Sequence, residues 1–190
     1  MARRHNLRQH VLASSLLIML PLLGACSSFS TYPPDGTGLR TYPWIAPGPE
    51  VMATGLRQAH ARVAPESPLV FNLPAGISQM AWDDVQRRLG PDARPMEPGD
   101  TVVWDLERYG ISNTKAFADI GYWNEGTAVL VTTSMERRNI APFRVTHVQR
   151  WYVELQTPVC NNPRFLTPAE DSSGTDTQSA GDTEGSGAGS

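Results

Sequence analysis

Residues 115–134, KAFADIGYWNEGTAVLVTTS, decide the predicted fold. The two runs at 115–123 and 127–134 are rich in the β-branched and aromatic residues that strands favour. Between them stands Asn124-Glu125-Gly126, and its glycine suits the left-handed position of a three-residue hairpin loop. The stretch therefore predicts an antiparallel β-hairpin.

Two further runs extend this hairpin on either side. Residues 101–106 precede it and residues 143–155 follow it, and both have the two-residue period of a strand. The last run alternates along its whole length, so one face is predicted to carry Phe143, Val145, His147, Gln149, Trp151, Val153 and Leu155. The prediction is a four-stranded antiparallel meander, or a five-stranded sheet if the short run 69–73 joins it.

Two helices are predicted before the sheet. In 49–62 the apolar stripe has the 3.6-residue period of a helix, and Pro65 stops it. The second helix is 79–89, with Ser78 in the capping position and Gly90-Pro91 at its end. Two helices followed by a meander predict an α+β domain over 49–166, with both helices packed on one face of the sheet.

The first 25 residues are predicted to be a signal peptide. Three arginines precede an apolar run at 11–23, which is too short for a transmembrane helix of roughly 20 residues. The run ends in Leu23-Gly24-Ala25-Cys26, which resembles the lipobox of bacterial lipoproteins. That resemblance implies cleavage before Cys26 and acylation of its sulfur and amine. The alternative is ordinary cleavage after Ala25, which would leave Cys26 able to pair with Cys160.

The segments that flank the domain have a different composition from it. Residues 26–48 contain many prolines and are predicted to be a semi-extended tether, whose ~20 residues at ~3 Å each could hold the domain several tens of Å from a membrane. Residues 167–190 are rich in Ser, Gly, Asp and Glu and are predicted to be a disordered acidic tail.

Charge argues against one class of partner. Residues 38–166 contain 13 basic and 13 acidic side chains, and the whole chain has a net charge of −3. A neutral domain with an acidic tail lacks the basic footprint of a nucleic-acid-binding protein. The predicted partners are the membrane, through acylated Cys26, and other proteins of the cell envelope. Ser27 in place of an inner-membrane retention Asp favours the outer membrane, with the domain in the periplasm.

The sequence contains no strong catalytic, cofactor or metal signature, and no such site is predicted. Ser112-Asn113-Thr114-Lys115 matches the Ser-x-x-Lys of penicillin-recognising enzymes, but it stands between two strands and its partner motifs are missing. Asp105 and Glu107 would lie on one strand face at a spacing suited to acid/base chemistry. Salt bridges to Arg108 and Arg150 are the simpler interpretation, so the protein is predicted not to be an enzyme.

Two polar residues interrupt the apolar face of the last strand. His147 and Gln149 would need partners if buried, and Asp119 or Thr133 on neighbouring strands could supply them. The other interpretation is a ligand pocket around His147, Gln149 and Trp151. The loop 136–142, with Arg137 and Arg138, is the most accessible basic spot.

One family resemblance concerns the domain. Gly76-Ile77-Ser78, followed by Val85 and Leu89-Gly90-Pro91, is similar to the helix of the small accessory lipoproteins of the outer-membrane β-barrel assembly machine. The chain departs from that family in having a longer helix, a preceding helix and a fourth strand. No functional residue is transferred from it.

The sequence thus predicts a membrane-anchored bacterial lipoprotein that acts as a non-enzymatic interaction or scaffold module. The alternative is a periplasmic domain that binds a small ligand or lipid near His147, Gln149 and Trp151. A hydrolase is the third hypothesis.

Overall fold

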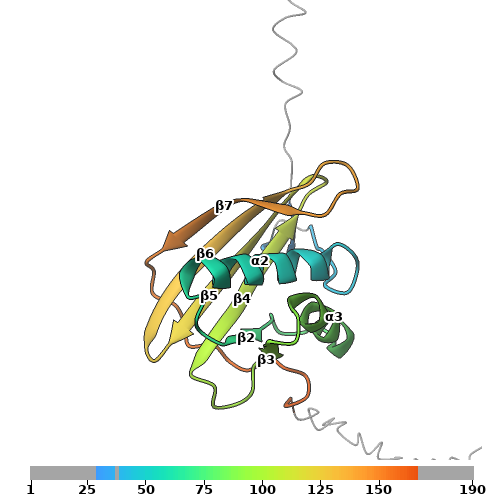
Figure 1. Ribbon diagram of the computed structural model, residues 1–190. Helices are drawn as coiled ribbons and strands as arrows, with labels where there is room; N and C mark the ends of the chain where they lie inside the picture. The colour runs from blue at the N-terminus through green and yellow to red at the C-terminus, as the bar shows by residue number, and fades with distance from the viewer. Residues whose placement is uncertain (1–28, 37–38, 167–190) are drawn as a thin grey trace, which may run out of the picture.

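The computed structural model describes residues 29–36 and 39–166, and it shows an α+β domain (Figure 1). Seven strands form one sheet, and two helices lie on the same side of it. The elements are β1 (Ser30–Tyr32), α2 (Gly48–Val63), β2 (Leu69–Asn72), α3 (Gln79–Leu89), β3 (Ala93–Pro95), β4 (Val102–Ile111), β5 (Lys115–Asn124), β6 (Thr127–Glu136) and β7 (Arg144–Trp151).

The sheet is mixed and runs in the order β3-β2-β4-β5-β6-β7, with β1 also paired to β4. Strand β2 is parallel to both β3 and β4, and every other pair is antiparallel. The predicted α+β class and the two helices are confirmed. The prediction of a four- or five-stranded antiparallel sheet covers only part of this seven-stranded mixed sheet. It missed β1 and β3 because each has three residues, which is too short to show a period in the sequence.

The hairpin that decided the prediction is present, with a shorter loop. Asn124 pairs with Thr127, so only Glu125 and Gly126 turn the chain. Both have positive φ, 45° and 89°, which is the geometry of the two-residue type I′ turn. This turn matches the right-handed twist of the strands better than the predicted three-residue loop does.

Helix α2 lies across β4, β5, β6 and β7 and forms the main core with them (Figure 1). The predicted stripe is buried through Met52, Leu56 and Ala59. Gly55 faces the sheet so closely that a Cβ there would lie 2.7 Å from the Ala118 Cβ. At Gly55 the backbone of the helix therefore packs directly on strand β5.

Helix α3 packs against α2 and β3. Trp82 is fully buried and stacks on Phe71 of β2, with ring centroids 5.6 Å apart. Ser78 occupies the N-cap position, but its side chain makes no capping hydrogen bond. Gly90 ends the helix with φ of 107°, as its sequence position predicts.

The sheet face opposite the helices, called the outer face here, has a small core of its own. It consists of Val70, Met96 and Val103, with Trp123 and Cys160 packed against them. Strand β7 ends at Trp151 rather than at residue 155. The chain that follows β7 leads to the segment Val159–Asn162. This segment forms hydrogen bonds with Asn72 of β2 and with the carbonyl groups of Leu73 and Met96, which follow β2 and β3.

The segment predicted as a tether contributes a strand in its described part. Residues Ser30–Tyr32 pair with β4, Thr31 is 1 % exposed, and the Tyr32 hydroxyl donates to the Ala75 carbonyl over 2.8 Å. The sequence Ser-Thr-Tyr suits a strand. Strand β2 pairs only with the first half of β4, at Trp104 and Asp105, so the same edge of the second half of β4 is open to pair with β1. Cys26, the predicted signal peptide and the predicted acidic tail lie outside the described residues.

Candidate functional site

A β-bulge in β7 decides where the predicted ligand residues lie. Val145 pairs with Met135 and His147 pairs with Ser134, so Thr146 is an extra residue in β7. The extra residue reverses the alternation, and Val145 and Val148 both pack on the main core. His147, Gln149 and Trp151 consequently lie on the outer face.

These three side chains do not enclose a buried pocket. His147 and Gln149 are exposed and contact each other, with 3.3 Å between Nε2 and Oε1, and Gln149 also donates to the Arg150 carbonyl. Neither contacts Asp119 or Thr133, which were the predicted partners. Thr133 is buried under α2 and donates to the Ala118 carbonyl.

A chain of polar side chains instead crosses four strands of the outer face. The Trp151 indole donates to the Thr132 hydroxyl over 3.1 Å, and that hydroxyl donates to Asp119 over 2.6 Å. Arg108 completes the chain with a 2.7 Å ion pair to Asp119, and its guanidinium lies 5.3 Å from the Phe117 ring centroid. Every member has a partner, so the arrangement links the four strands through their side chains.

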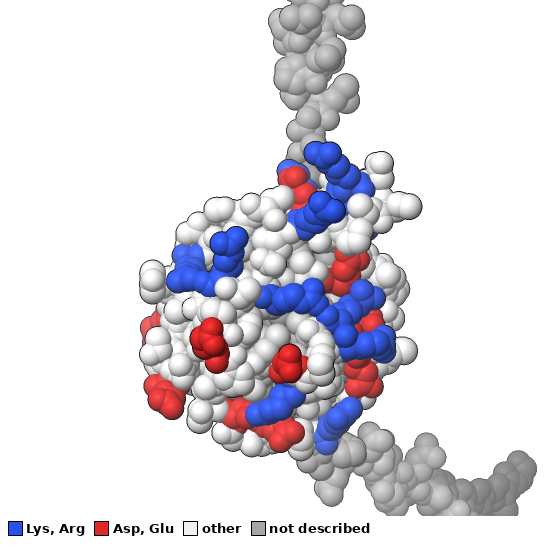
Figure 2. Space-filling view, in the orientation of Figure 1, with Lys and Arg blue, Asp and Glu red and all other residues white. Residues whose placement is uncertain are grey.

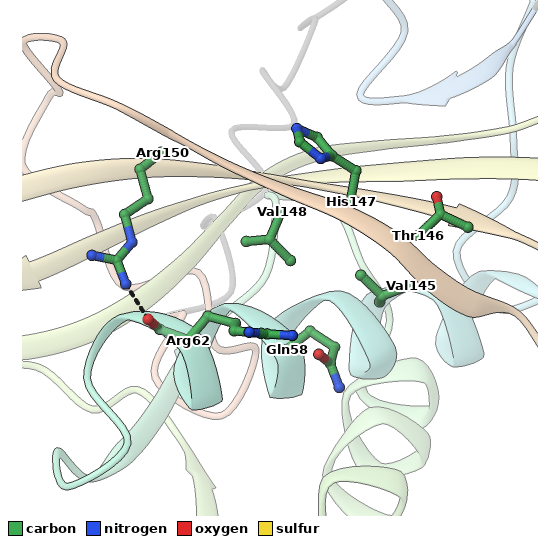
Figure 3. A pocket seen from close by; sticks show the side chains of 7 residues that line it. All are labelled: Gln58, Arg62, Val145, Thr146, His147, Val148 and Arg150. Carbon is green, nitrogen blue, oxygen red and sulfur yellow. Dashed lines mark hydrogen bonds between the residues drawn. The ribbon is translucent and has the colours of Figure 1, made fainter.

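A groove of about 430 Å³ separates the C-terminal part of α2 from β7 (Figure 3). Arg62 and Gln58 line its helix side, and Arg150 and His147 belong to the strand side. The Arg150 guanidinium donates to the Arg62 carbonyl and closes one end. Figure 3 shows His147 turned away from α2, so the two arginines dominate the groove.

Arginines also gather on the helix side of the molecule as a whole. Figure 2 shows this side with blue groups over α2 and α3. Acidic groups lie among those of α3, where Asp84 binds Arg87 and Arg88. We call Arg57, Arg62, Arg88 and Arg150 the arginine band; Arg57 donates to the Arg88 carbonyl as Arg150 does to Arg62. Within the described part of the chain, Arg57, Arg62 and Arg150 have no carboxylate within ion-pair distance. The neutral net charge of the domain conceals this uneven distribution.

The carboxylates Asp105 and Glu107 lie on the outer face beside a hollow of about 450 Å³ that residues 154–159 help to line. Glu107 is the extra residue of a bulge in β4, since Leu106 pairs with Ile120 and Arg108 with Asp119. Neither predicted salt bridge forms, because Arg108 binds Asp119 and Arg150 binds a carbonyl group.

Asp105 is the most perturbed carboxyl group of the site. Its pKa is raised to about 6: burial is the main cause, the hydrogen bond from Asn72 opposes it, and the charge of Glu107 adds to it. The Asn72 amide donates to Asp105 over 2.9 Å and to the Val159 carbonyl over 2.9 Å. Asp105 is thus an ionisable group held between β2 and the C-terminal segment.

We expect Asp105→Asn to stabilise the domain near pH 7.5 by about 1–2 kcal/mol. The upper limit is ~3 kcal/mol, which is the free energy that corresponds to the rise of the Asp105 pKa from 3.8 to about 6. The native state holds the Asp105 proton more tightly than the unfolded state. The wild-type stability therefore falls as the pH rises from about 4 to about 6 and stays lowered above that.

Urea unfolding across this range tests the prediction. The amide can still accept the bond from Asn72, and it removes the charge that burial opposes. The gain should therefore be largest above pH 6 and largely vanish near pH 4. An equal change in stability at both pH values would contradict it.

The remaining predicted sites are structural in their described parts. The Ser112 hydroxyl donates to the Lys115 carbonyl in the β4–β5 turn, and Lys115 lies 3.9 Å from Glu136. Cys160 is half-buried, and its thiol contacts the Met96 carbonyl at 3.5 Å. Across residues 29–36 and 39–166 no cluster of three metal-binding side chains occurs. No helix in that part of the chain is long and apolar enough to cross a bilayer.

Comparison with known proteins gives no family for the chain: no protein family, curated protein or solved structure matches it.

Proposed function

We propose that the protein is a bacterial lipoprotein, anchored through acylated Cys26 to the periplasmic side of the outer membrane, whose domain binds another envelope protein without catalysis. The lipobox at 23–26 supports the anchor. Two or three acyl chains give stable attachment where one would be marginal. Together with the domain over 49–166 and the tail over 167–190, this is the organisation expected from the sequence.

The observation that carries the interaction is the arginine band. Arginine is favoured at protein interfaces because its planar guanidinium binds carboxylates in pairs of hydrogen bonds. Arg57 and Arg150 are held by carbonyl groups, so they are oriented without being neutralised. An acidic surface of a partner fits this face. The similarity of residues 76–91 to the accessory lipoproteins makes components of the barrel-assembly machine one class of partner to look for.

Two measurements test the proposal. Intact mass of the N-terminal peptide should show an acylated Cys26, and Cys26→Ser should move the protein from the membrane to the soluble fraction. A photo-crosslinker at Arg62 should capture a defined acidic protein in the native host, while one at the exposed Val159, on the outer face of the sheet, should not. An unmodified Cys26, or identical capture from both positions, would contradict the proposal.

A second candidate function is the binding of a small anionic ligand in the groove between α2 and β7. Its volume is in the range of ligand sites, and Arg62 and Arg150 supply the charge. Of the three residues predicted for a pocket, only His147 borders this groove. An Arg150→Gln variant that loses binding of an anionic metabolite, seen by thermal shift, would favour this function over the first.

A further inference from the structure

Three parts of the chain meet at one end of the sheet. Ser30 at the start of β1 pairs with Ile111 at the end of β4. The β4–β5 turn follows directly, and Arg137 of the β6–β7 loop binds it through Nε to the Asn113 carbonyl and through its backbone N–H to the Thr114 carbonyl, each over 2.9 Å. The turn and the loop lie together at the top of Figure 1. We call this end of the molecule the anchor end.

The anchor end must lie close to the bilayer if Cys26 is acylated. Only Ser27 and Ser28 lie between Cys26 and Phe29, and the three Cα–Cα steps span at most about 11 Å when fully extended. Phe29 itself is fixed to the sheet, with its ring 5.3 Å from that of Phe117. The span of about 11 Å from Cys26 to Phe29 is close to the Debye length of about 8 Å at physiological salt, so charges at the anchor end act on the lipid headgroups.

The composition of the anchor end suits an anionic surface. Lys115, Arg137, Arg138 and Arg144 gather there against Glu136, and a hollow of about 500 Å³ is lined by the three arginines and that carboxylate. Among the described residues, no carboxylate lies within ion-pair distance of Arg138 or Arg144. Figure 2 shows blue groups at this upper end of the molecule.

The loop also presents an apolar side chain to the outside. Ile140 is 99 % exposed. The loop around it is held firmly: Glu50 of α2 accepts from the Phe143 N–H over 2.7 Å, and the Arg137 guanidinium lies 4.7 Å from the Phe143 ring centroid. A fixed apolar tip between arginines matches the bilayer interface, where the apolar group enters the acyl region and the cations bind phosphates.

We propose that the β6–β7 loop is a second membrane contact, in which Ile140 enters the bilayer interface and Arg138 and Arg144 bind anionic phospholipid headgroups. This inference rests on the proposed acylation of Cys26. Two contacts would fix the orientation of the domain, with the β5–β6 turn far from the bilayer and the arginine band open to the side. The phosphate groups that Arg138 and Arg144 would bind are those of the lipid headgroups, in the same membrane that holds the acylated Cys26.

The test uses the acylated full chain in vesicles, with a fluorophore on Ile140→Cys in a Cys160→Ser background. The matched control carries it on Thr127→Cys, at the start of the ten-residue strand β6, about 30 Å from the anchor end where that strand finishes. In vesicles of phosphatidylcholine and phosphatidylglycerol, lipid-borne quenchers should quench the label at 140 and leave the label at 127 bright. Arg138→Ala with Arg144→Ala should lower the ratio of docked to undocked domain roughly 30-fold.

The outcomes separate the two proposals. Equal quenching at 140 and 127 in a chain that stays on the vesicles would overturn the second contact and leave the anchor intact. A chain that leaves neutral vesicles during carbonate extraction would contradict the anchor and this inference with it. Crosslinks from position 140 that reach an acidic protein in place of lipid would also overturn it.

Discussion

Replacing Gly55 by leucine is expected to abolish the folded domain. A Cβ at this position would lie 2.7 Å from the Ala118 Cβ and 3.1 Å from the Thr133 hydroxyl oxygen. Neither neighbour can move away, because both belong to the central strands and are fully buried. A larger side chain must lift α2 from the sheet, at a cost of about 3 kcal/mol or more from a total stability of about 5–15 kcal/mol.

The same position allows a graded measurement. Gly55→Ala gains about 1 kcal/mol of helix propensity, but we expect a net loss of about 1–2 kcal/mol because of the contact with Ala118. Combining it with Ala118→Gly should recover part of that loss, and urea unfolding of the full double-mutant cycle measures the coupling. Gln58→Ala, on the same helix outside the core, is the control. A stabilised Gly55→Ala protein would show that helix and sheet are not in close contact.

Replacing Asn72 by alanine is expected to destabilise the domain by about 3 kcal/mol, since each of three hydrogen bonds contributes about 1 kcal/mol. Asn72 is fully buried, and its amide binds Asp105 and the Val159 carbonyl while its oxygen accepts from the Asn161 N–H over 3.1 Å. The substitution leaves all three partners without their bonds. It therefore releases the C-terminal segment from β2 itself, while the bonds of this segment to the Leu73 and Met96 carbonyls remain.

This release has a local readout besides global stability. In a Cys26→Ser background, the half-buried Cys160 should react with a thiol reagent several-fold faster once Asn72 is alanine, because its neighbours 159 and 161 lose their bonds to β2. Asn113→Ala, at the exposed β4–β5 turn, should change neither stability nor reactivity. Unchanged labelling of Cys160 in the Asn72 variant would mean that the segment is held by other contacts.

Much of the fold could be predicted from local sequence. The stripes of α2 and α3, the hairpin at Glu125-Gly126 and the long strands all have a period that a single sequence reveals. The short strands could not be predicted, because Ser30–Tyr32 becomes a strand only through pairing with Ile111 some eighty residues later. The parallel placement of β2 likewise depends on which edge of β4 remains open after β5 has paired.

The candidate site was harder to predict, because bulges do not show in a pattern of period two. The run 143–155 alternates throughout, so Thr146 carries no signal that the faces exchange there. That single extra residue moved His147, Gln149 and Trp151 from the predicted apolar face to the outer face. The arginine band was missed for a different reason: it is assembled from α2, α3 and β7, and only the tertiary structure brings Arg57, Arg88 and Arg150 to one side.

Strand β1 has a mechanical consequence. With an anchor at Cys26, any tension between the membrane and a bound partner enters the domain at Ser30. A pull along β1 loads its three residue pairs with β4 together, in shear, and does not open them one after another. Because β4 is paired with β5 along almost its whole length, the load passes into the centre of the sheet. The domain would therefore behave as a stiff link between the bilayer and its partner.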